Sequence, residues 1–214
     1  VLLCGLEEEQ PRPRVRLTIL LMQNECQTRR PYHRGPIVAL TSNPFMTIQE
    51  TYRYLISARR DLCATLQTVP DEVLARPLLN GPAFHCIKDI LFHIAAVEDG
   101  WLREDILREP PVLASNLALK DTPGGPSYAG VPLHTLVDYW HAVEQRTLPY
   151  LVGLTSEELK RDVTPHDAPG DLFTVDGLLW HVMIHEMRHT AQVAMLLRTQ
   201  GIQPPSLDLY FYLR

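Results

Sequence analysis

The segment from Leu178 to Leu196 combines a helical apolar repeat with histidines spaced four residues apart. Residues four apart lie on one face of an α-helix, one turn from each other. The apolar stripe of this helix consists of Leu178, Val182, His185, His189, Val193 and Leu196. Both imidazoles on the stripe are therefore expected to face the core, where each needs a partner. Two such histidines on one buried stripe indicate a metal-binding pair rather than two separately satisfied core residues.

Three other segments share this helical periodicity, which predicts an all-α protein. The four expected helices cover residues 47–69, 85–108, 132–153 and 174–200. Thr47 and Thr174 are suitable N-caps, and Gly201 supplies a C-terminal stop. A short helical turn is expected at 156–161, and no segment alternates in the manner of a half-buried strand. Four amphipathic helices predict a four-helix bundle, a fold that builds metal sites between facing helices.

Two segments lack the helical period. Residues 1–45 mix arginines and prolines without a sustained repeat, so they are interpreted as a loosely ordered N-terminal extension. The bundle is expected to cover residues 46–214. Residues 109–130, rich in proline and glycine, are interpreted as a long surface connection between the second and third helices.

The composition excludes several classes of partner. The chain has 214 residues, 45% of them hydrophobic, and a net charge of -5 with an isoelectric point near 6.0. This balance gives no basic surface for nucleic acid or anionic lipid, and no apolar run approaches the roughly 20 residues that cross a bilayer. The four cysteines are scattered and form no CxxC pair. A soluble, cytoplasmic protein that acts on a small molecule is expected.

The letters of the fourth helix also match the HExxH motif of zinc peptidases, in which the glutamate acts as general base. Such enzymes take a third ligand from further along the chain. After Glu186 the only acidic residue is Asp208, and no histidine follows His189. A peptidase is therefore disfavoured.

A third protein ligand must then come from an earlier segment, since catalytic zinc-type sites usually have three protein ligands and an open position. His93 lies in the middle of the second helix at the edge of its apolar face. His181 is a competitor, because its spacing from His185 equals that between His185 and His189. The remaining candidates are interpreted as surface or capping residues: His85, His134 and His141.

Three segments of the chain resemble one family in the same order. They read FHIAAVEDGW at 92–101, HVMIHEMRHTAQVAMLLR at 181–198 and GIQPP at 201–205. The chain from Met46 to Arg214 thus resembles the DinB/YfiT-like metalloenzymes. The resemblance implies an up-down-down-up four-helix bundle, commonly a homodimer, with a divalent metal bound by His93, His185 and His189. Many members have His-His-Arg-Gly-Gln where this chain has RHTAQ at 188–192.

The chemistry of such a site follows from its donors. Three neutral imidazoles leave the ion its +2 charge and an open position, so it can lower the pKa of a bound water or thiol. Zinc is the default ion, although nickel, iron and copper also accept imidazole. An activated water would make the protein a hydrolase. The wider superfamily resembles enzymes that use a low-molecular-weight thiol, which implies an S-transferase as a second possibility. The alternative is a non-catalytic, metal-stabilised bundle that serves as a dimeric binding or stress-response module.

Other polar residues near the histidines are weaker candidates for function. Glu186 and Gln192 are the catalytic candidates, with Glu186 interpreted as an exposed acid or a neighbour of the ligands, and Gln192 as a hydrogen-bonding partner of a ligand. Glu98 and Asp99 are candidates for orienting a histidine, although charged residues there are more often solvated. Trp101 and Trp180 are interpreted as core or subunit-interface aromatics rather than pocket walls.

Overall fold

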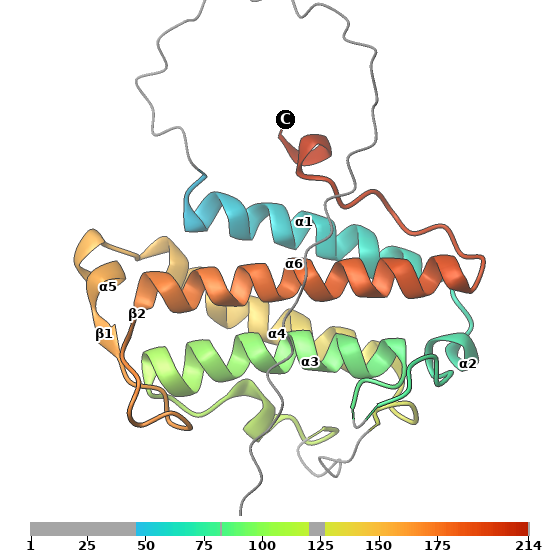
Figure 1. Cartoon of the computed structure of the whole chain (residues 1–214), viewed down its shortest axis with the longest axis horizontal. Helices are drawn as coiled ribbons and strands as arrows, with labels where there is room; N and C mark the ends of the chain where they lie inside the picture. Colours follow the sequence, from blue (N-terminus) through green and yellow to red (C-terminus); the bar gives the residue numbers. More distant parts are fainter. Residues whose placement is uncertain (1–45, 82, 120–126, 214) are drawn as a thin grey trace, which may run out of the picture. The chain divides into compact units, whose positions relative to one another are not determined.

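The computed structural model describes residues 46–81, 83–119 and 127–213. Four long helices form the bundle: α1 (Ile48–Leu66), α3 (Ile87–Asp99), α4 (Leu133–Val152) and α6 (Val175–Thr199). Helices α1 and α6 run in one direction, and α3 and α4 run in the opposite direction (Figure 1). The predicted all-α, up-down-down-up bundle is confirmed. The predicted extension at residues 1–45 lies outside the described residues.

Short elements connect the four helices. They are α2 (Asp71–Leu74), the π-helix η1 (Gly100–Leu107), the 3₁₀ helices η2 (Val112–Ser115) and η3 (Leu209–Tyr212), and α5 (Ser156–Lys160). The predicted second helix is therefore α3 continued by η1, and α5 is the predicted helical turn. The prediction that the chain has no strand was wrong. Strands β1 (Asp162–Val163) and β2 (Phe173–Thr174) form an antiparallel pair, but two residues each are too few to show alternation in sequence.

The helix termini follow from local chemistry. Thr47 accepts a hydrogen bond from the Glu50 amide while the Glu50 carboxylate accepts one from the Thr47 amide, which completes a capping box. Thr174 caps α6 through its side chain, which accepts a hydrogen bond from the Gly177 amide. After α6, Gly201 has φ +76° and its amide bonds to the Arg198 carbonyl. The three predicted termini are thus confirmed.

Gly201→Ala is expected to lower the free energy of unfolding by about 1–2 kcal/mol, the cost of a left-handed conformation for a residue with a Cβ. An added Cβ at Gly201 would meet nothing within 4 Å, so backbone strain alone sets the loss. Gly130 is the matched control, because its Cβ would also meet open space but its φ is not positive. Urea unfolding should show Gly130→Ala within about 0.5 kcal/mol of the wild type. Equal losses at both positions would contradict the strain argument.

The core consists of two apolar clusters at opposite ends of the bundle. One cluster contains apolar residues from the first half of α1, between Ile48 and Ile56, and from the start of α6. The other contains Leu62 and Leu66 of α1 and apolar residues from the end of α6. Between them lies a group of buried, mutually paired charged residues, one from each of the four long helices. These four residues, named here the Arg59 cluster, are Arg59, Glu98, Glu144 and Glu186. The middle of the bundle is therefore polar, and the candidate site lies at this level.

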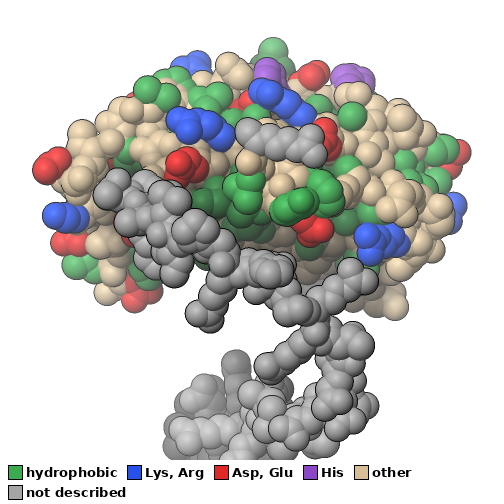
Figure 2. Space-filling model, turned by 90° about the horizontal axis from the view of Figure 1, so that it is seen from above, with side chains coloured by type: hydrophobic (Ala, Val, Ile, Leu, Met, Phe, Trp, Pro, Cys, Tyr) green, Lys and Arg blue, Asp and Glu red, His purple; other side chains and the backbone are tan. Residues whose placement is uncertain are grey.

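The described surface carries charges of both signs (Figure 2), as expected from a chain with a net charge of only -5. On the face drawn in Figure 2, acidic and basic side chains are interspersed over the described residues. Among the helices of the described ranges, none is long and apolar enough to cross a bilayer.

Candidate metal centre

Three histidines from two antiparallel helices meet in the middle of the bundle. His93 comes from α3, and His185 and His189 come from successive turns of α6. One ligand atom from each of the three lies within 4.8 Å of the others. The ring centroids are 4.7 Å apart for His93 and His185, 4.9 Å for His93 and His189, and 4.3 Å for His185 and His189. The structure thus brings together the three residues that the sequence predicts as ligands.

These imidazoles are neutral at physiological pH. Burial lowers the pKa of His93 to about 4, with the neighbouring His189 and Arg188 adding to the effect. Burial also lowers the pKa of His185 to about 3, again with a contribution from His189. The pKa of His189 is lowered by burial as well. Because only a neutral imidazole has a lone pair to donate, the triad is in the state that metal binding requires.

Gln192 orients one of the candidate ligands. Its Oε1 lies 2.6 Å from Nδ1 of His189, one turn earlier on α6. An amide oxygen only accepts, so Nδ1 carries the proton and Nε2 holds the lone pair. Nε2 of His185 lies 2.9 Å from Nε2 of His93, so these two donors also face one point. Gln192 therefore lies where the sequence argument placed it, bonded to a ligand candidate.

The other histidines lie outside the triad. His181, the competitor with identical spacing, is exposed and packs against Trp101 at a ring-centroid distance of 5.3 Å. Its ring is 5.9 Å from that of His185, and within the described ranges the triad is the set of donors that could share an ion. His134 and His141 are exposed on α4, and Nδ1 of His85 lies 3.4 Å from the Leu79 carbonyl. Trp101 and Trp180 are half-buried against the apolar cluster at the start of α6.

Glu186 does not lie on the surface, so its interpretation as an exposed acid was wrong. It is 3% exposed, and its two oxygens accept hydrogen bonds from Arg59 Nε at 3.1 Å and from an Arg59 terminal nitrogen at 2.7 Å. Burial raises the pKa of Glu186, an effect that Arg59 opposes. A carboxylate occupied by a guanidinium in this way is not free to act as the general base of an HExxH peptidase.

Glu98 and Asp99 are buried as well, which corrects the expectation that they are solvated. Glu98 accepts hydrogen bonds from Tyr52, Thr147 and Arg59. Asp99 accepts bonds from two backbone amides of η2 and from the Tyr139 hydroxyl. Among the described residues neither carboxylate bonds to a histidine, so both organise the bundle rather than the triad.

Two residues beside the triad carry no signal in the sequence. Phe84 packs against His93 with ring centroids 4.4 Å apart, and its backbone has φ 60°, a left-handed conformation that is rare for an aromatic residue. Arg188 is exposed, and one terminal nitrogen lies 3.4 Å from Nε2 of His189. Phe84 and Arg188 therefore form an apolar and a cationic boundary of the site.

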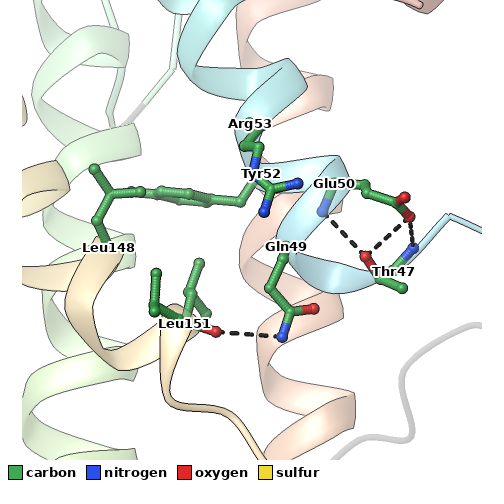
Figure 3. A pocket seen from close by; sticks show the side chains of 8 residues that line it. Thr47, Gln49, Glu50, Tyr52, Arg53, Leu148 and Leu151 are labelled. Carbon is green, nitrogen blue, oxygen red and sulfur yellow. Dashed lines mark hydrogen bonds between the residues drawn. The ribbon is translucent and has the colours of Figure 1, made fainter.

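A separate pocket of about 430 Å³ lies between the start of α1 and the end of α4 (Figure 3). Three of its polar residues bond to the protein: Gln49 donates to the Leu151 carbonyl, and Thr47 and Glu50 form the capping box. No histidine of the triad lines this pocket. The chemistry of the candidate centre therefore does not involve it.

Comparisons with known proteins agree with the fold. The model of the DinB family matches residues 39–214. YfiT from Bacillus subtilis, described as a probable metal-dependent hydrolase with an unusual four-helix bundle topology, is 15% identical with a TM-score of 0.53, covering 78% of this chain and 97% of its own. A DinB-like protein from Bacillus cereus is 19% identical with a TM-score of 0.49, over 75% of this chain and 97% of its own. Among curated proteins, none matches the sequence.

Proposed function

The chain belongs to the DinB family, and on this premise we propose that it is a divalent-metal-dependent enzyme acting on a small molecule. The observation that carries the proposal is the triad of His93, His185 and His189, whose donor atoms lie within 4.8 Å of one another. Hydrolysis and thiol S-transfer are the two reactions proposed. The description of YfiT as a probable metal-dependent hydrolase supports the first.

The donor set suits a first-row divalent ion. Three neutral imidazoles bind zinc, nickel, iron or copper, with zinc as the default. His93 is half-buried while His185 and His189 are 6% and 7% exposed, so the triad is reached from the His93 side. An ion bound there would supply Lewis acidity, lowering the pKa of a water or low-molecular-weight thiol.

The residues around the triad have distinct roles in this proposal. Gln192 holds His189 in one tautomer and so presents its Nε2 to the ion. Phe84 excludes water from one side of His93. Glu186, bonded to Arg59, fixes the α6 turn that carries His185 rather than transferring a proton.

Metal analysis tests the proposal directly. Tag-free protein purified without added metal is expected to carry about one divalent ion per chain, because three imidazoles suffice for a tight site. Plasma mass spectrometry should show that His93→Ala, His185→Ala and His189→Ala each lose the ion. His181→Ala, which removes the exposed histidine on the same helix, is the control and should keep it. An ion-free wild type, or loss confined to His181→Ala, would overturn the ligand assignment.

Ligand exchange then separates an enzyme from a metal-stabilised binding module. An ion with an open position should bind azide, imidazole or a thiol, with a change in its spectrum after cobalt substitution. A metal-loaded protein that binds none of the three would favour the non-catalytic function.

A further inference from the structure

Arg188 places a positive charge beside the triad. Its terminal nitrogen lies 3.4 Å from Nε2 of His189, and its side chain is exposed on α6. Within the part of the chain that the structure describes, no ion pair includes Arg188. The guanidinium therefore has no carboxylate partner there, and its contact is with the Nε2 lone pair of His189, which an ion at the triad would occupy. With an ion bound, its planar pair of donors would be available to a ligand.

The charges near the triad are arranged asymmetrically. The carboxylate of Glu186, next to His185, and that of Glu98, later on the same helix as His93, are both bonded to Arg59 in the buried layer. The exposed side has Arg188 instead, and a divalent ion on neutral imidazoles would add two further positive charges. An anionic ligand is the complement of such a site.

Phe84 supplies an apolar surface next to these charges. Its ring centroid is 4.4 Å from that of His93 and 6.2 Å from that of His189. Its left-handed backbone conformation, with φ 60°, is one that aromatic residues adopt only where the surrounding structure holds it. The chemical complement of an apolar ring and a cation beside one metal centre is a ligand that combines an apolar group with an anionic group.

We propose that Arg188 is a specificity-determining residue that binds the carboxylate of a small organic acid at the metal centre. The inference rests on the proposed function, because it assigns the substrate class of the same site. The planar guanidinium matches a carboxylate with two parallel hydrogen bonds, which a lysine or glutamine cannot reproduce.

The test is ligand binding to protein reconstituted with Co²⁺, whose visible absorption reports changes at the ion. Acetate is the anionic probe and imidazole the neutral one. Arg188→Gln is expected to weaken acetate binding at least about tenfold, since charge-assisted bonds of this kind are worth a factor of ten or more, and to leave imidazole binding unchanged. Arg198→Gln is the matched control, because it removes the same charge from an exposed position on the same helix.

The outcomes separate this inference from the proposed function. Equal weakening by Arg188→Gln and Arg198→Gln would reduce the effect to net charge and overturn the inference. Acetate binding that is absent in the wild type, or unchanged in Arg188→Gln, would overturn it too while leaving the metal site intact. A wild type that binds no Co²⁺ would remove the proposed function and this inference with it.

Discussion

Arg59→Met is expected to lower the free energy of unfolding by about 3–5 kcal/mol at pH 7, because it leaves buried carboxylates without their cation. The four side chains of the Arg59 cluster are 2–4% exposed. Burial by itself lowers the pKa of Arg59, but Glu186 and Glu98 outweigh it and hold that pKa well above its ordinary value. The guanidinium therefore stays charged and compensates three acidic groups from three other helices. Urea unfolding followed by far-UV circular dichroism measures the loss.

Arg60→Met is the control for this prediction, since it removes the adjacent arginine from the same helix. The Arg60 side chain is 70% exposed and lies 3.6 Å from Glu144. Because Arg60 is largely solvated, its pair with the buried Glu144 is expected to contribute only about 0–1 kcal/mol. Arg59→Lys should fall between the two, because a lysine keeps the charge but not the fork of donors. Losses from Arg59→Met no larger than those from Arg60→Met would show that the cluster does not stabilise the bundle.

The burial of the acidic residues in the Arg59 cluster could not be predicted from the sequence. Helix periodicity identified the apolar stripes because burial of apolar residues repeats every turn, and the capping residues marked the ends. A charged residue beside such a stripe is normally solvated, so Glu186 and Glu98 were interpreted by that rule. Their burial depends on Arg59, which is 127 and 39 residues away in sequence. The residue pattern within one helix cannot predict ion pairs between residues so far apart in sequence.

Some residues of the candidate site could be predicted from the sequence, and others could not. His185 and His189 could be predicted because their spacing is a property of one helix. The choice of His93 over His181 needed the second helix or the family resemblance, since spacing alone does not say which helix lies opposite. Phe84 could not be predicted, because its place against His93 depends on a left-handed loop residue that ordinary aromatic preferences oppose.

Acid is expected to destabilise the metal-free protein steeply between pH 6.5 and about 4. An unfolded histidine has a pKa of about 6.5, whereas in the folded protein that of His185 is about 3 and that of His93 about 4. Because both folded values are depressed, the stability is fully present above pH 6.5. As the pH falls, the unfolded chain takes up protons that the folded one does not, and each histidine costs about 1.4 kcal/mol per pH unit.

His185→Gln isolates one of these contributions. Urea unfolding in a chelating buffer at pH 7, 6 and 5 should give the variant a pH slope shallower than the wild type by about 1.4 kcal/mol per unit near pH 5, where the two states differ by one proton. Glu186, whose pKa is raised by burial, contributes a slope of opposite sign, but it is present in both proteins and cancels in the comparison. His181→Gln is the matched variant, because it removes an exposed histidine from the same helix. Parallel slopes for the wild type and His185→Gln would mean that His185 accepts a proton in the folded state, which contradicts a buried, neutral triad prepared for a metal ion.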